Sequence, residues 1–235
     1  MAQSPTADLP EEMPVFLAGL SVGLLPLLSV IVAPSDQQTT YLVYGYLAAG
    51  IPFVFICLRW QCLGSQPATL RRLLFIALAV RLLLLFVPPI LSEDLWRYIW
   101  DGYHIWEGLS PYITAPSDAA EDAFATTHNL DFVRSQIGHA HIPTVYPPTA
   151  QLTFALGTIW GPSVTWLRCI MITADLVTIM ALWSWAKELD RPPQVAAIYA
   201  FAPLAVLESA VGVHIDSVGV ATLTLGLLLF TRGAH

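Results

Sequence analysis

The feature that most constrains this chain is an uncharged run of twenty residues, Pro14–Ala33, near the N-terminus. A helix of that length crosses a hydrocarbon core of about 30 Å. Across the chain 56% of the residues are hydrophobic and 11% are charged, whereas an ordinary soluble domain has about 25% charged residues. The sequence therefore predicts an all-α integral membrane protein.

Further apolar runs extend this pattern into a multi-span helical bundle, with three spans within residues 14–91 and three within 163–232. The predicted spans are Pro14–Ala33, Tyr41–Leu58, Leu73–Leu91, Ser163–Ala186, Val195–Val211 and His214–Phe230. The connection Arg59–Arg72 has three arginines and no acid, so the positive-inside rule places it, and with it the N-terminus, in the cytoplasm. Residues 1–13 are polar and acidic, and we expect them to be disordered, without a cleaved signal peptide.

The run Thr149–Trp160 leaves one question of topology open. Its twelve residues reach only about 18 Å as a helix, which is too short to span. If it crossed nevertheless, Lys187 and Arg191 would lie outside, against the charge rule. We therefore expect it to be re-entrant or interfacial, so that residues 92–162 form one large outer loop.

Three charged residues fall inside the third and fourth predicted spans. Arg81 lies in the middle of the third span, and Arg168 and Asp175 lie seven residues apart on one face of the fourth. Charges at membrane depth are costly unless they find partners. We expect these residues to form structural pairs between neighbouring helices.

Charged and aromatic residues interleave between Ser92 and Tyr112, directly after the third span. If the segment is helical, Asp94, Arg97, Tyr98 and Asp101 share one face. Another face is apolar and flanked by Trp and Tyr, so we expect an interfacial helix with its carboxylates just above the bilayer. An aromatic anchor without chemistry is the plainer alternative.

The topology brings Asp94 to the same outer side as Glu208, His214 and Asp216. A carboxylate there could act as general base for an incoming hydroxyl, and Arg97 could hold a phosphate leaving group. Structural roles stay open. Those alternatives are a helix-capping Glu93, an ion pair between Asp101 and Arg97, and a satisfied interhelical His214.

Several classes of function are disfavoured. The net charge of −7 offers no basic surface for nucleic acid. Neither a phosphate-binding glycine loop, a Ser-His-Asp order nor a zinc motif is present, and the three cysteines fit packing roles. His139 and His141 have a spacing that suits metal ligands, but no third ligand is obvious, so we predict no metal or other cofactor, although a divalent ion stays open.

The sequence S-E-D-L-W-R-Y-I-W-D-G, from Ser92 to Gly102, resembles the first outer loop of GT-C membrane glycosyltransferases, in particular bacterial mannosyltransferases that use polyprenyl-phosphate sugars. Further pieces follow in order. These are G-L-S-P-Y from Gly108, P-T-V-Y-P-P-T-A-Q from Pro143, A-D-L from Ala174 and P-L-A-V-L-E-S-A-V-G-V-H-I-D from Pro203.

This resemblance implies a GT-C fold and assigns the catalytic base to Asp94, with Glu93 at the position of the family's second acid. The residues expected to bind substrate are Glu93, Arg97, Tyr98, Trp100, Asp101, Tyr146, Glu208, His214 and Asp216. It also implies a polyprenyl-phosphate sugar donor, a glycan or glycolipid acceptor, and an active site on the outer face of a bacterial inner membrane. Family members commonly have more spans, so we expect a truncated C-terminal half. The alternatives are a non-catalytic membrane subunit that binds a lipid-linked glycan or partner chain and, less favoured, a transporter.

Overall fold

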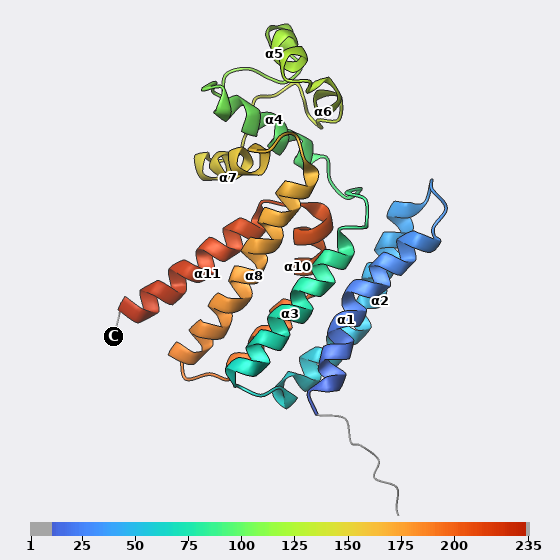
Figure 1. Ribbon diagram of the computed structural model, residues 1–235, viewed down its shortest axis with the longest axis vertical. Coiled ribbons are helices and arrows are strands. Elements are labelled where there is room, and N and C mark those ends of the chain that lie inside the picture. The colour runs from blue at the N-terminus through green and yellow to red at the C-terminus, as the bar shows by residue number, and fades with distance from the viewer. Residues whose placement is uncertain (1–10, 234–235) are drawn as a thin grey trace, which may run out of the picture.

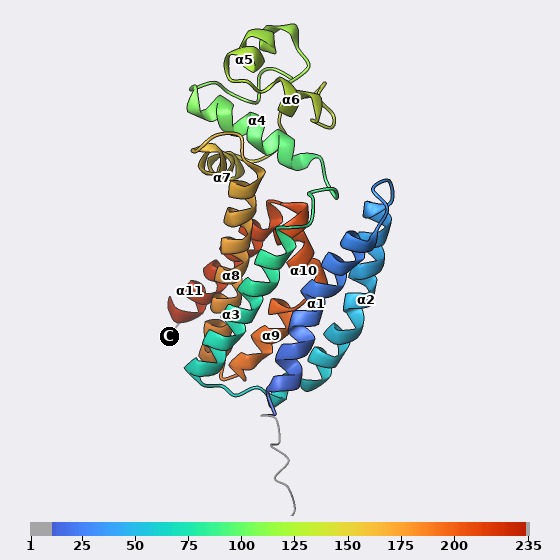
Figure 2. The same ribbon diagram turned by 45° about the vertical axis from the view of Figure 1, so that its right-hand side comes forward.

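The computed structural model describes residues 11–233, which form helices and no strand. Figure 1 shows long helices running side by side, with a smaller group of short helices stacked on one end. The start of α1 and the end of α11 both lie away from that group (Figure 2). We call the two parts the bundle and the outer region, the latter being residues 92–158.

The bundle contains five long helices. They are α1 (Met13–Val32), α2 (Gln38–Arg59), α3 (Pro67–Leu84), α8 (Val164–Glu188) and α11 (Asp216–Gly233), with η1 (Trp60–Cys62) after α2. Three segments are long and apolar enough to cross a membrane, namely Met13–Val32, Gln38–Cys62 and Val164–Glu188. The chain is thus a helical membrane protein, while the full count of six spans stays a prediction.

Two predicted spans differ from the helices observed. The third was expected at Leu73–Leu91, but α3 begins earlier and ends at Leu84, shortly before Pro88 and Pro89, which cannot continue a helix. The fifth, Val195–Val211, is broken into four short helices. These are η3 (Pro193–Val195), α9 (Ala196–Ala200), α10 (Pro203–Leu207) and the π-helix η4 (Glu208–Gly212), and the two halves are bent by 59°.

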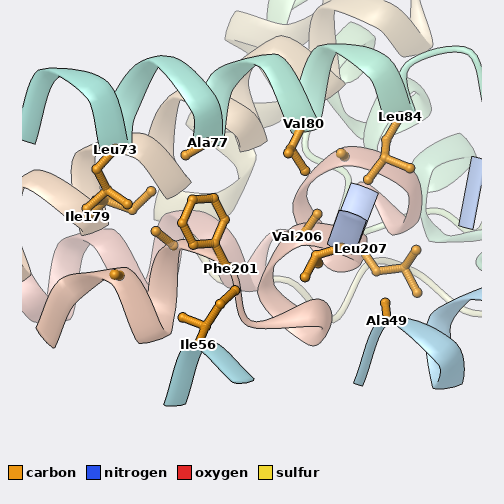
Figure 3. Packing of buried hydrophobic residues seen from close by; sticks show 14 of the residues in the cluster. Ala49, Ile56, Leu73, Ala77, Val80, Leu84, Ile179, Phe201, Val206 and Leu207 are labelled. Atoms are coloured by element: carbon orange, nitrogen blue, oxygen red, sulfur yellow. The ribbon is translucent and has the colours of Figure 1, made fainter. Parts of the chain in front are cut away.

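Pro203 is the physical reason for the break in the fifth span. It begins α10, and the preceding Ala202 is extended, with φ −62° and ψ 119°, as steric contact with a following proline favours. Figure 3 shows the ring of Phe201, at the end of α9, beside Ile56 and below Leu73 and Ala77 of α3. All of these side chains are fully buried, so the broken segment is packed into the bundle core.

Two of the three buried charges form the pair between helices that was expected. Arg81 of α3 pairs with Asp175 of α8. Arg168 does not pair with Asp175; its guanidinium donates to the carbonyls of Leu85 and Val87, at 2.9 and 2.8 Å. These carbonyls follow the last turn of α3 and have no helical partner.

The outer region consists of α4 (Asp94–Trp106), η2 (Ala119–Glu121), α5 (Asp122–Thr127), α6 (Asp131–Ser135) and α7 (Pro148–Thr158). In Figures 1 and 2, α4 lies between α7 on one side and α5 and α6 on the other. Leu95 and Ile99 are fully buried in a second core with Phe154 and Leu130. Protein therefore covers this part of the apolar face of α4, which was expected to rest in lipid, and the interfacial position of the helix stays a prediction.

The short run predicted not to cross forms α7, which lies across the end of the bundle (Figure 1). It exposes large apolar side chains, namely Leu152, Leu156, Ile159 and Trp160. It is not among the segments long and apolar enough to cross a membrane, and its re-entrant or interfacial position stays a prediction.

The predicted disordered N-terminus, 1–13, falls largely outside the described residues. Within them, Glu12 is held in place: its carboxylate accepts from the Gly64 N–H at 3.0 Å and from the Thr69 hydroxyl at 3.1 Å, and pairs with Arg72. Glu12, which the prediction included in the disordered segment, is therefore bound to the residues around the start of α3.

Candidate active site

Asp94 opens α4 and its side chain is exposed. Its backbone N–H donates to Ser92 Oγ at 3.1 Å, so Ser92 and not Glu93 supplies the side-chain oxygen at this helix start. Glu93 is also exposed, and its carboxylate lies against Gly138, where an added Cβ would be 2.5 Å from Glu93 Oε2. The two neighbouring acids therefore face different surroundings.

Arg97 is buried, and its guanidinium is occupied by backbone carbonyls. It donates to Ile142 O at 3.0 and 3.1 Å and to His139 O at 3.1 Å, and burial lowers its pKa. The described contacts include no ion pair with Asp101. Arg97 thus fixes the loop before α7, and its donors are not directed at a phosphate site.

Tyr98 and Tyr146 meet beside Asp94. The Tyr98 ring stacks on Phe154 of α7 at 4.2 Å and meets Tyr146 edge-on at 5.1 Å. Burial, followed by the contact with the Tyr146 hydroxyl, raises the pKa of Tyr98 well above its ordinary value. Burial raises the pKa of Tyr146 as well, and the nearby Asp94 carboxylate adds to that effect.

Two residues expected to bind substrate are enclosed by protein. Asp101 is fully buried and Trp100 is 2% exposed. Gln151 of α7 donates to Asp101 Oδ2 at 3.0 Å, whereas Trp100 packs against Phe124 and lies near Arg134. Neither side chain reaches the surface on which Asp94 lies.

His214 is half-buried at the connection between η4 and α11, and it pairs through Nδ1 with Glu208. The hydrogen bond to Glu208 raises the pKa of His214, burial opposes that rise, and the charges of Asp94 and Asp216 add to it. The predicted convergence of Asp94 with this cluster is therefore present in the structure. Asp216 is the first residue of α11 and is exposed.

The backbone before His214 has an uncommon conformation. Val213 is fully buried and adopts the left-handed region, with φ 59° and ψ 33°, which is unfavourable for a β-branched residue. The same peptide segment folds back so that Val213 N–H and His214 N–H both donate to Glu208 O. The strained turn thereby fixes His214 beside its carboxylate partner.

A groove of about 610 Å³ adjoins this cluster between α7 and α11. Its lining is mostly apolar or threonine, with Asp216 as its one charged residue. It is lined by Pro147, Thr149, Ala150, Thr153, Ile215, Asp216, Val218, Gly219, Thr222 and Leu223. The groove thus joins the polar cluster to the apolar sides of two helices.

A comparison with known protein families identifies the family of this chain. Residues 12–235 match the family model described as alpha-(1->6)-mannopyranosyltransferase, N-terminal domain (MptA_B family). The chain belongs to this mannosyltransferase family. No curated protein and no solved structure shows a significant match. The membership confirms the mannosyltransferase resemblance, and it makes the chain part of a family of glycosyltransferases.

In this member of the mannosyltransferase family, some side chains that shape the site were not assigned from the sequence. Phe154 stacks under Tyr98, and Gln151 joins Asp101 to Thr144, with Nε2 3.1 Å from Thr144 Oγ1. Both lie on α7, and Gln151 ends the P-T-V-Y-P-P-T-A-Q segment that carries part of the resemblance. The order of that motif was the only signal that could have marked Gln151.

For metal binding, residues 11–233 of this mannosyltransferase family member contain no group of three or more His, Cys, Asp or Glu side chains arranged to hold an ion. The rings of His139 and His141 lie 6.1 Å apart. Both side chains are exposed.

Proposed function

We propose that this protein transfers mannose from a polyprenyl-phosphate carrier to an acceptor hydroxyl at the outer face of a bacterial inner membrane, with Asp94 as general base. The family supports the mannosyl group and the reaction class. The observation that carries the rest is the exposed carboxylate of Asp94, whose charge acts on His214, together with the groove between α7 and α11 that begins at the neighbouring Ile215 and Asp216.

The proposed step is a direct displacement at the anomeric carbon. The Asp94 carboxylate takes the proton of the acceptor hydroxyl while the acceptor oxygen forms its bond to that carbon. The bond between the carbon and the phosphate oxygen breaks, and the polyprenyl phosphate leaves with the bonding electron pair. The sugar is therefore transferred with inversion.

The groove favours a lipid-linked donor. Its apolar lining suits a polyprenyl chain, and it ends at the polar cluster where the phosphate would lie. Because the donors of Arg97 are occupied by carbonyls, we assign the cationic contact with the phosphate to His214. Its pairing with Glu208 favours the charged imidazolium.

The test is transfer of radiolabelled mannose from polyprenyl-phosphate mannose to lipid acceptors, in membranes that contain either the protein or its Asp94→Asn variant. We expect the variant to lose about 100-fold to 10,000-fold in rate, since it keeps the shape but not the base. Asp36→Asn is a matched control, because Asp36 is an exposed carboxylate in the connection between α1 and α2.

Two other outcomes would change the proposal. Equal transfer by the protein and Asp94→Asn would remove Asp94 as base. No transfer by either, with both chains folded in the membrane and with donor bound, would favour the alternative of a non-catalytic subunit that binds a lipid-linked glycan.

A further inference from the structure

The exposed basic side chains of this protein gather at one end of the bundle. The sequence has ten lysines and arginines. Six of them lie at the end away from the outer region, where α1 and α3 begin and where α2, α8 and α11 end (Figures 1 and 2). These exposed side chains are Arg59, Arg71, Arg72, Lys187, Arg191 and Arg232.

The other four basic residues are occupied by groups of the protein itself. Arg81 and Arg134 pair with carboxylates. The guanidiniums of Arg97 and Arg168 donate to backbone carbonyls. The exposed guanidinium and ammonium groups are therefore confined to one end of a chain whose net charge is −7, and that end is where the protein attracts an anion.

A groove of about 560 Å³ lies along the first turns of α3 at this end. Its lining residues have helical spacing and share one face of α3. They are Ala68, Arg71, Arg72, Phe75 and Ile76. The two apolar side chains lie one turn further along α3 than the two arginines, a rise of about 6 Å. The groove thus changes from cationic to apolar in the direction of the middle of the bundle.

Both arginines have donors for a ligand. Among the described residues, no ion pair includes Arg71. Arg72 pairs with Glu12 through Nη1, but a guanidinium has five N–H donors, and the Arg72 side chain is 57% exposed. The contact with Glu12 therefore holds Arg72 beside the groove and leaves donors for an anion.

The apolar half of the groove indicates what kind of anion fits. Phe75 is 73% exposed, directly beside two guanidiniums. A free phosphate would use the arginines and leave Phe75 uncovered, whereas an amphiphile covers both halves. The order of the groove matches a phospholipid in its leaflet, with the phosphate at the end of the bundle and the acyl chain toward the middle of the membrane.

We propose that this groove binds one anionic phospholipid, with its phosphate on Arg71 and Arg72 and an acyl chain against Phe75. Guanidinium groups match phosphate oxygens in a planar, two-point fashion. By the positive-inside rule the lipid belongs to the cytoplasmic leaflet. The site lies at the start of α3, whereas Asp94 follows the end of that helix, so the inference does not depend on the proposed reaction.

A second hollow beside α3 suits an anion less well. It measures about 230 Å³ and contains Lys187 and Arg232. Glu188 lines the same hollow and pairs with Arg232 at 2.7 Å. An anion there would meet a carboxylate, so the groove beside Arg71 is the better match.

The experiment measures lipid binding to the purified chain in detergent, by native mass spectrometry and by the unfolding temperature as each probe is added. The probes are phosphatidylglycerol, which is anionic, phosphatidylcholine with the same acyl chains, and inorganic phosphate. We expect phosphatidylglycerol alone to stay bound and to raise the unfolding temperature by a few degrees, because a ligand that binds only the folded state stabilises it.

Two variants locate the site. Arg71→Gln removes one guanidinium without breaking an ion pair, and we expect phosphatidylglycerol to bind about tenfold more weakly. Phe75→Ala should also weaken this binding, because the acyl chain loses its contact. Arg191→Gln is the matched control, since it removes the same charge at an exposed position that does not line the groove. Without added lipid, all three variants should unfold near the wild-type temperature.

Loss of binding in Arg71→Gln and Phe75→Ala, but not in Arg191→Gln, would support the site. Equal binding of phosphatidylglycerol and phosphatidylcholine would overturn it and leave the arginines as a signal for topology. Inorganic phosphate that stabilised the protein as strongly as phosphatidylglycerol would also overturn it, because the ligand would then be a free anion. Equal losses in Arg71→Gln and Arg191→Gln would assign the effect to the overall charge of this end and not to the groove.

Discussion

Arg81 of α3 and Asp175 of α8 form an ion pair inside the bundle, and neither side chain is more than 1% exposed. Arg81 Nη1 also donates to Ala200 O at 3.1 Å, at the end of α9, and the Ser209 hydroxyl donates to Asp175 Oδ2 at 3.1 Å. The pair therefore joins two long helices to both sides of the broken segment. Arg81 thereby donates to the carbonyl of Ala200, which the break leaves outside a regular helix.

Loss of either partner of this pair should destabilise the protein strongly. Arg81→Met and Asp175→Leu each leave a buried charge alone, which costs about 3 kcal/mol or more. We expect the thermal unfolding temperature in detergent to fall for both. The double variant should recover part of the loss, and Arg71→Gln, an exposed site on the same helix, should be near the wild type. A double variant whose loss of stability equals the sum of the two single losses would exclude coupling between the two residues.

The bundle could be predicted from hydropathy, but its internal partners could not. A long apolar run predicts a span, and a charged residue inside a span requires some partner. The spacing of Arg168 and Asp175 shows only that they share a face, and in the structure both reach toward α3 or the residues after it. Pro203 was visible in the fifth span, but whether a proline kinks or breaks a helix depends on its neighbours.

The candidate site shows the same division. Topology alone placed Asp94 and His214 on one side, because two predicted crossings, an even number, lie between them. The apolar face of α4 was expected to rest in lipid, because periodicity does not tell lipid from protein, and α7 covers part of that face. Contacts such as Tyr98 on Phe154 depend on how α4 and α7 dock, which no local pattern encodes.

The close approach of α4 to α7 depends on Gly102. A Cβ at this position would be 2.6 Å from both Phe154 O and Thr158 Oγ1, and a backbone atom cannot move aside cheaply. Gly102→Ala should therefore separate the two helices, lower the unfolding temperature and reduce transfer, since α4 carries Asp94. Both quantities can be measured on one purified sample.

Gly50→Ala is the matched control for this variant. Gly50 lies within α2, and an added Cβ there meets nothing within 4 Å. Alanine is also the better helix former, so this variant should be as stable as the wild type. If Gly102→Ala behaved in the same way, α4 and α7 could not be packed as closely as described.

The pairing of His214 with Glu208 predicts a pH-dependent stability. Because its partner raises the pKa of His214, the pair stabilises the fold fully below the unfolded value of about 6.5. This contribution is lost as the pH rises through the higher folded value. The difference in unfolding temperature between the wild type and His214→Gln should therefore be larger at pH 6 than at pH 9. A difference that does not change with pH, or His141→Gln showing the same trend, would contradict an ionised pair.

Asp101 and Gln151 predict a loss of stability in the same direction with pH, from a different cause. Gln151 Nε2 donates to Asp101 Oδ2, while Asp101 Oδ1 and Gln151 Oε1 are buried without a hydrogen-bond partner. Burial raises the pKa of Asp101, and a proton on its carboxyl would give these two oxygens a donor that they otherwise lack. The folded protein thus binds this proton more tightly than the unfolded chain, so stability is greatest below the unfolded value of about 3.9 and falls as the pH rises through the folded value.

Asp101→Asn tests this assignment, because an amide offers the donor at every pH and has no charge to bury. We expect its unfolding temperature to equal or exceed that of the wild type at pH 8, with the difference shrinking toward pH 5. Asp101→Leu should be less stable than both, since it removes one of the two acceptors of the Gln151 amide and leaves only Thr144 Oγ1. If Asp101→Asn were instead the less stable protein at pH 8, the carboxylate would be ionised in the fold, and the nearby Arg97 would be its counter-charge.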